Sequence, residues 1–154
     1  IFYTHARLLE NGCQHIGGGS ITMIPVVETR SEDITDYIST NIISICDGQL
    51  VLSLKKFNKG ERPAIDYGLS VSRLGGQVQS REMKKVGIKI KQDLLSYLEI
   101  RDIYELVNLD DLGENMKNRM VEGQKILSKL NQYKYSPLTK EQMVVLFDDI
   151  KEVK

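Results

Sequence analysis

Hydrophobic and polar positions follow two different patterns along this chain, and the change falls near residue 76. Before it, short runs of β-branched residues are separated by Gly and Asp, which predicts buried strands that alternate with short helices. The strands are expected at residues 20–27, 41–46, 49–54 and 69–72, and the helices at residues 2–9 and 31–37. This alternation is typical of an α/β domain with a mainly parallel sheet, and the small number of strands predicts that the sheet is incomplete.

After residue 76, apolar residues recur at helical spacing and predict three amphipathic helices of a bundle. The stripes are formed by Met83, Val86, Ile90, Leu94, Tyr97 and Tyr104, then by Met116, Met120, Leu127 and Leu130, and then by Met143, Leu146 and Ile150. We interpret these stripes as core positions rather than as a cofactor site. The pattern therefore divides the chain into an α/β part, residues 1–75, and a helical part, residues 76–154, which is expected to be truncated.

Two local features refine the helical part. Thr139 can cap the last helix while the Gln142 side chain reaches back to the Thr139 backbone, as in a capping box, and Pro137 separates this helix from the preceding one. Gly87 and Gly123 fall inside helical patterns, where each costs about 1 kcal/mol relative to Ala. Their presence predicts that another segment packs close at both points.

Composition adds few constraints. The 154 residues, 41% of them hydrophobic, can bury a core, and 21 basic against 21 acidic residues leave no net charge that would point to nucleic acid or an acidic membrane. We expect a soluble chain, because no apolar run approaches the roughly 18 residues of a membrane-spanning helix. No secretory signal is expected after Ile1, and the missing initiator Met suggests a fragment or a processed chain. Cys13 and Cys46 lack CxxC spacing, which favours packed thiols in a reducing compartment over a disulfide or a zinc site.

Two segments invite a ligand-binding interpretation. The glycines of residues 17–20 (GGGS) lead into a predicted strand rather than opening a helix, so a flexible connection is favoured over a phosphate loop. No GxxxxGK[ST] occurs, so the chain has no standard means of binding a nucleoside triphosphate alone. Residues 81–91 carry five basic residues and one acidic residue; a solvated helix face is favoured, and a nucleic-acid patch is the alternative. His5 and His15 lack metal-ligand spacing.

Arg73 is the candidate for phosphate chemistry. It ends a predicted strand, follows the hydroxyl residues Ser70 and Ser72, and precedes a turn at Gly75 and Gly76. A guanidinium is a planar fork of donors that stays charged, and it suits phosphate oxygens better than an ammonium does. From these residues alone, a surface or ion-pair arginine remains the commoner alternative.

Five segments together carry a resemblance to a known family. They are YTHARLLE at 3–10, GGGSITMIPVVET at 17–29, TNIISICDGQL at 40–50, RPAIDYGLSVSRLGG at 62–76 and YSPLTKEQ at 135–142. In this order and at these spacings, the chain resembles the alpha subunits of F-type ATP synthases over essentially its whole length. The resemblance implies the C-terminal part of a RecA-like P-loop NTPase domain, followed by the family's C-terminal helical domain.

The resemblance also implies a place in a rotary enzyme that is coupled to proton transport. Alpha and beta subunits would alternate in an alpha3-beta3 hexamer around a gamma-type rotor shaft, with ATP or ADP and Mg²⁺ held at the interfaces. The complex would be peripheral, on the cytoplasmic, matrix or stromal face of an energy-transducing membrane, and would meet the membrane only through the proton-channel sector. No nucleic-acid partner is implied, and the chain alone is expected to hold no cofactor and to be inactive.

Residue by residue, the resemblance places Arg73 on the family's arginine finger, which reaches the catalytic site of the neighbouring beta subunit. Ser44 falls on a serine near that phosphate, and Ser70 falls on a position required for activity. Arg62 and Gln132 match residues that contact the adenine end of the non-catalytic nucleotide. No metal ligand is implied in this chain.

The chain departs from the family pattern in three places. Ser39 and Cys46 replace a Pro and a Thr, and residues 105–111 replace a loop that faces the rotor. A divergent rotary-type ATPase paralogue with another role is therefore an alternative. Two others are an RNA-translocating hexameric helicase of the transcription-terminator kind, against which the helical part and the YSPLT segment argue, and a free-standing helical interaction module.

Overall fold

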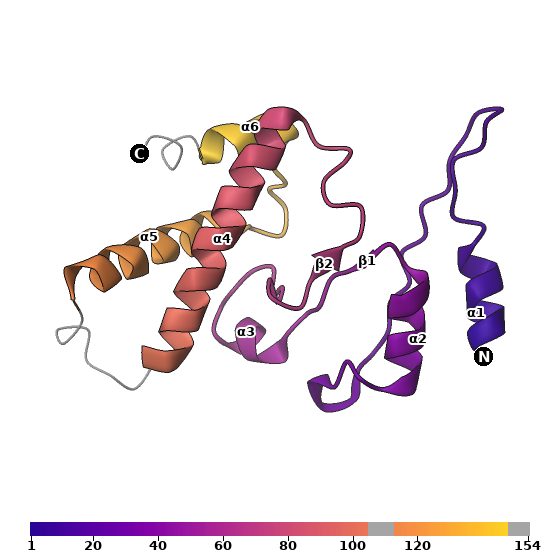
Figure 1. Ribbon diagram of the computed structural model, residues 1–154, viewed down its shortest axis with the longest axis horizontal. Coiled ribbons are helices and arrows are strands. Elements are labelled where there is room, and N and C mark those ends of the chain that lie inside the picture. Colours follow the sequence, from indigo (N-terminus) through magenta and orange to yellow (C-terminus); the bar gives the residue numbers. More distant parts are fainter. Residues whose placement is uncertain (105–112, 148–154) are drawn as a thin grey trace.

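The computed structural model describes residues 1–104 and 113–147 (Figure 1). Along the chain, the elements are helix α1 (Phe2–Leu9), the 3₁₀ helix η1 (Arg30–Glu32), helix α2 (Tyr37–Ile45), strand β1 (Gly48–Gln49), helix α3 (Leu54–Asn58), strand β2 (Val71–Ser72) and helices α4 (Arg81–Tyr104), α5 (Glu114–Leu130) and α6 (Lys140–Leu146). Figure 1 shows α1 and α2 at one end of an elongated molecule and α4, α5 and α6 at the other. Two segments of the sequence interpretation lie outside the described residues: residues 105–111, which replace the family's rotor-facing loop, and Ile150 of the last predicted helix.

The helices of the second half form where their apolar stripes predict them. Helix α4 packs against both α5 and α6, and buried side chains of α4 and α5 meet Phe147, which directly follows α6, in one core. The core consists of Val86, Leu94, Tyr97, Leu98, Ile126 and Phe147. Leu94 and Ile126 are the most deeply buried of these, so the centre of the core lies where α4 crosses α5.

Gly87 and Gly123 differ in how closely another segment packs against them. A Cβ atom added to Gly123 would lie 2.2 Å from both Cβ and Cγ of Tyr97, so α5 can approach α4 only because residue 123 has no side chain. A Cβ atom added to Gly87 would meet nothing within 4 Å. The prediction of close packing is therefore confirmed at Gly123 and wrong at Gly87, which lies on an exposed face of α4.

The prediction of a mainly parallel sheet is wrong for the described residues. Strands β1 and β2 form a two-stranded antiparallel sheet in which Gly48 lies opposite Ser72. Residues 20–27 form no strand beyond an isolated bridge between Ser20 and Gln14. A strand needs a neighbouring backbone to pair with, and the side chains of Ile24 and Val26 are instead 82% and 92% exposed.

Helix α1 has the predicted bounds, whereas the segments around α2 do not. Residues 41–46 belong mostly to α2 rather than to a strand, because Ser39 and Ile42, three positions apart, share a buried helical face. Strand propensity of β-branched residues depends on context and gives way to such packing. The helix expected at residues 31–37 is reduced to η1, since the Glu32 carboxylate instead accepts hydrogen bonds from backbone amides of Leu54 and Lys55 at the start of α3.

The predicted capping box of the last helix is confirmed. The Thr139 hydroxyl accepts from the Gln142 amide at 3.3 Å, and the Gln142 side chain accepts from the Thr139 amide at 2.9 Å. These two bonds satisfy backbone donors that the first turn of α6 would otherwise leave without partners. None of the described helices combines the length and the apolar character that a membrane crossing requires.

Replacing Thr139 with Ala is expected to lower the free energy of unfolding by about 1 kcal/mol, because the amide of Gln142 loses its acceptor. Urea unfolding followed by circular dichroism measures the change. Ser136→Ala is the matched control, since Ser136 is exposed and is held only through its backbone amide, which donates to Tyr133. Equal stability of the two variants would show that the cap contributes nothing.

Candidate functional site

Arg73 directly follows β2, and its guanidinium lies against the C-terminal end of α2. One terminal nitrogen donates to the carbonyl of Ser44 and the other to the carbonyl of Ile43, each at 3.1 Å. The last carbonyls of a helix have no intrahelical partner and carry partial negative charge, so they attract and orient a cation. The backbone amide of Arg73 also donates to the backbone carbonyl of Asp47 at 2.8 Å, which fixes the start of the side chain.

The guanidinium remains accessible in this arrangement. Arg73 is exposed, and its two bonds to α2 use two of the roughly five N–H donors that a guanidinium carries. The structure thus holds a planar cation at one place on the surface and leaves donors for an anion. This geometry suits a phosphoryl group better than a mobile surface arginine would.

The two predicted serines have different surroundings. The Ser44 hydroxyl donates to the carbonyl of Asn41 at 2.7 Å, within α2, while the Ser44 carbonyl receives Arg73. The structure therefore brings Ser44 and Arg73 together. The Ser70 hydroxyl accepts from the amide of Val51 at 3.0 Å and so ties the segment before β2 to the segment after β1. This bond lies directly before the strand that leads to Arg73.

Arg62 and Gln132 are seventy positions apart in sequence and are joined directly through their backbones. The Gln132 amide donates to the Arg62 carbonyl at 2.7 Å, and the side chain of Asn131 accepts from the Arg62 amide at 2.8 Å. The Arg62 guanidinium lies 3.7 Å from the centre of the Phe57 ring and donates to the Phe57 carbonyl. The pair therefore forms a second candidate site, held between α3 and the end of α5.

The structure also places a charged pair beside Arg62 that the sequence interpretation missed. Arg101 on α4 donates to the carboxylate of Glu61 at 3.0 Å, and Glu61 is only 5% exposed. Burial opposes the charge of Arg101, but the hydrogen bond and negative charge of Glu61 outweigh it and raise the pKa of Arg101. Burial, aided by Glu61, also raises the pKa of Tyr67. One signal was available: Arg101 continues the buried stripe of Leu94 and Tyr97, where an apolar residue is expected.

Comparison with known proteins shows what the chain is similar to. The sequence model of the ATP synthase alpha/beta family, nucleotide-binding domain, matches residues 1–72. The ATP synthase subunit alpha of Petrotoga mobilis is 42% identical over 149 residues, which cover 95% of this chain and 29% of the relative. That of Syntrophomonas wolfei is 41% identical over 148 residues, which cover 94% of this chain and 29% of the relative.

The chain is similar to the nucleotide-binding domain of the ATP synthase alpha/beta family over residues 1–72 and to these alpha subunits over nearly its whole length. The resemblance to the alpha subunit that the five sequence segments indicate is thereby confirmed. The chain spans about 29% of the length of these curated relatives. The roles of Arg73, Ser70, Ser44, Arg62 and Gln132 stay predictions.

The GGGS segment is a connection between elements, as predicted. Gly18 and Gly19 have φ angles of 105° and 85°, which favour glycine, and the amide of His15 donates to the Gly19 carbonyl across the bend. No helix begins at residue 20 whose amides could surround a phosphate. Residues 17–20 therefore do not form a P-loop of the alpha/beta family.

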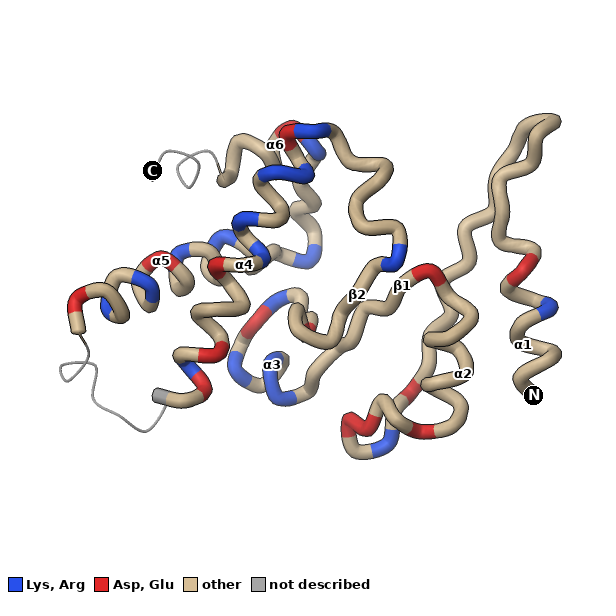
Figure 2. The backbone as a smooth tube through the Cα atoms, in the orientation of Figure 1, with Lys and Arg blue, Asp and Glu red and all other residues tan. Residues whose placement is uncertain are grey.

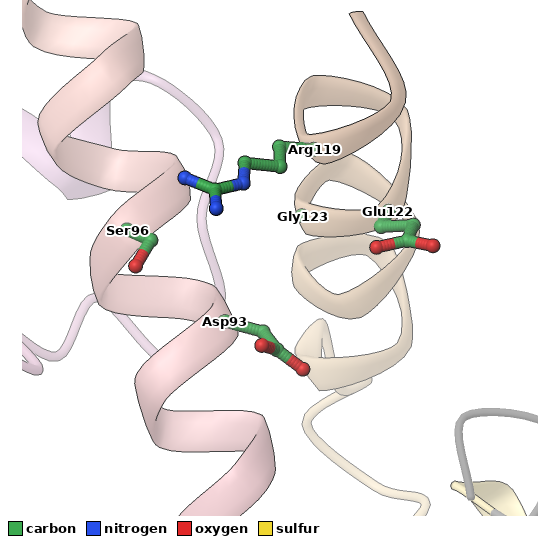
Figure 3. Close-up of a pocket in the computed structure, with 5 residues that line it drawn as sticks. All are labelled: Asp93, Ser96, Arg119, Glu122 and Gly123. Carbon is green, nitrogen blue, oxygen red and sulfur yellow. The ribbon is translucent and has the colours of Figure 1, made fainter. Parts of the chain in front are cut away.

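Two other surface features lie outside the five predicted site residues. A small hollow between α4 and α5 is lined by Asp93, Ser96, Arg119, Glu122 and Gly123 (Figure 3). Figure 2 shows the basic residues gathered along the first turns of α4. Four of them, Arg81, Lys84, Lys85 and Lys91, are exposed, which agrees with a solvated helix face.

Proposed function

We propose that this chain is part of the alpha subunit of a rotary F-type ATP synthase and supplies Arg73 as an arginine finger in trans. The nucleotide that it serves would be held by the neighbouring beta subunit of an alternating hexamer. The observation that carries the proposal is the exposed guanidinium that the carbonyls of Ile43 and Ser44 orient at the end of α2. A phosphate-directed cation needs this combination of fixed direction and access.

The finger acts on the charge that develops during phosphoryl transfer. Negative charge is spread over the γ-phosphoryl oxygens in the transition state, and a guanidinium placed in trans stabilises it. Such fingers contribute about a thousand- to a hundred-thousand-fold in rate, which is roughly 4 to 7 kcal/mol. Ser44 positions the guanidinium through its carbonyl, and Ser70 holds the strand from which Arg73 extends.

Arg62 and Gln132 are proposed to contact the adenine end of a second, non-catalytic nucleotide. Their direct backbone hydrogen bond supports this assignment, because it presents both residues on one local surface. Mg²⁺ bound with ATP or ADP would neutralise phosphate charge. No group of His, Cys, Asp and Glu suited to a metal ion occurs among residues 1–104 and 113–147, so we assign no residue of the described chain to the ion.

The larger assembly follows from the same proposal. Residues 1–75 would complete a RecA-like domain whose remaining strands cover the exposed segment 20–27, and residues 76–154 would belong to the helical domain. Partners would be beta subunits and a gamma-type rotor, and the complex would couple ATP synthesis to proton transport as a peripheral assembly on an energy-transducing membrane. The exposed apolar side chains of Ile24 and Val26 support a neighbouring surface of this kind.

This chain alone is expected to show no binding of Mg-ATP tighter than millimolar in calorimetry, because it contains no GxxxxGK[ST] segment. Its candidate residues would contact the ends of a nucleotide whose phosphates are held elsewhere. Binding of Mg-ATP in the micromolar range would contradict an action in trans. Arg62→Ala and Arg73→Ala are the comparison variants: the calorimetric heat on adding Mg-ATP should be the same for both as for the unchanged chain.

A further inference from the structure

Two successive residues, Glu61 and Arg62, are held by two different helices. Arg101 of α4 binds the Glu61 carboxylate at 3.0 Å. At the end of α5, Asn131 accepts from the Arg62 amide and Gln132 donates to the Arg62 carbonyl. Residues 61 and 62 therefore bridge the ends of α4 and α5.

The two helices are themselves fixed relative to each other close to this bridge. Gly123 of α5 lies directly against Tyr97 of α4, one turn before Arg101. The Arg101 guanidinium lies 5.8 Å from the centre of the Tyr97 ring. These contacts connect α5 to α4, and α4 to residues 61 and 62. The bond between Arg62 and Gln132 then connects this segment to the residues directly after α5.

Stability alone is a poor explanation for the buried pair. Removing two charges from water costs free energy that their attraction offsets only when the remaining polar atoms are also bonded. Here the second carboxylate oxygen of Glu61, Oε2, has no hydrogen-bond partner among the described residues, and Nε of Arg101 forms no hydrogen bond there and has an ion pair at 3.5 Å with the exposed carboxylate of Asp102. A well-packed apolar pair would serve stability equally well, but it would lack the fixed direction of a hydrogen bond.

We propose that Glu61 and Arg101 are positioning residues for nucleotide binding, which hold Arg62 and Gln132 in register with helices α4 and α5. Neither residue touches the nucleotide, and the inference rests on the proposed function, in which Arg62 and Gln132 contact the adenine end. Breaking the pair frees the segment before Pro63 from α4 while leaving its bonds to α5 in place. The affinity of the non-catalytic site should then fall, and the catalytic turnover should change little.

The test uses the assembled complex and Mg-ATP. Glu61→Gln and Arg101→Gln are each expected to raise the dissociation constant of the non-catalytic sites about ten-fold, because loss of register misplaces a binding group. Equilibrium dialysis measures this constant, and turnover at saturating Mg-ATP is followed in the same preparations. Asp102→Asn is the matched control, because Asp102 lies 3.5 Å from Arg101 but is exposed, and its removal should leave both values unchanged.

A double variant separates positioning from folding. Glu61→Leu with Arg101→Met should recover the thermal stability that the single variants lose but keep the ten-fold weaker binding, and it also carries the test if the single variants do not assemble. Recovery of affinity together with stability would overturn the inference. Arg62→Ala separates the nucleotide contact from the positioning role. If it leaves the affinity of the non-catalytic sites unchanged, the assignment of Arg62 to the adenine end fails as well. If it weakens binding while Glu61→Gln and Arg101→Gln do not, only the positioning role fails.

Discussion

Arg73→Lys in the assembled complex is expected to slow ATP turnover by about a thousand-fold while the affinity for Mg-ATP stays within about three-fold. The ammonium keeps the positive charge and loses the planar fork. In the structure, Arg73 uses both terminal nitrogens on the carbonyls of Ile43 and Ser44. The three donors of an ammonium diverge from one nitrogen, so a lysine cannot be held by both carbonyls of α2 and also present a planar pair of donors to the phosphoryl group. We therefore expect the loss to fall on the transition state.

The matched control for this variant is Arg81→Lys, which makes the same exchange at an exposed position at the start of α4. It should leave turnover and affinity unchanged. Unfolding curves of both variants check that assembly is intact. A turnover number of the Arg73→Lys complex equal to that of the wild type would remove Arg73 from the chemistry. A parallel loss of Mg-ATP affinity would indicate ground-state binding instead.

Gly123→Ala is expected to destabilise the helical part. The new Cβ atom would lie 2.2 Å from Cβ and Cγ of Tyr97, so α4 and α5 must separate or the ring must move. Overpacking of this kind costs about 3 kcal/mol, against which the better helix propensity of Ala returns about 1 kcal/mol. We therefore expect a net decrease of about 2 kcal/mol or more in the free energy of unfolding, measured by urea denaturation.

Gly87→Ala is the matched control for the same exchange on the other helix. A Cβ atom there meets nothing within 4 Å, so only the propensity gain remains and stability should rise by about 1 kcal/mol. Opposite signs at the two glycines are the expected result. If Gly123→Ala were also stabilising, the close crossing of α4 and α5 would be incorrect.

The helical part could be predicted from sequence because its information is local. Apolar residues at helical spacing and the pair Thr139 and Gln142 depend only on neighbours within a few turns. The strands could not be predicted in the same way, since a strand forms only where another backbone pairs with it. The residues around Ile42 have strand propensity, yet they lie in α2. The residues around Ile24 pair with no strand among the described residues.

The candidate site shows the same division between local and distant information. The resemblance selected Arg73 and Ser44, but no sequence pattern indicates that the carbonyl of Ser44, rather than its hydroxyl, meets the guanidinium. The pairing of Glu61 with Arg101 spans forty positions and joins single charged residues without a motif. Contacts of this kind become visible only when the chain is folded.

In the proposed function, Arg73 stabilises the transition state of phosphoryl transfer from a nucleotide that another subunit binds. The most direct measurement compares the affinity of the assembled complex for Mg-ADP with its affinity for Mg-ADP and fluoroaluminate, which imitates the transferring phosphoryl group. We expect Arg73→Lys to weaken fluoroaluminate-dependent binding about a thousand-fold and to leave Mg-ADP binding unchanged. Equal affinity of the wild-type and Arg73→Lys complexes for the fluoroaluminate complex would contradict this expectation.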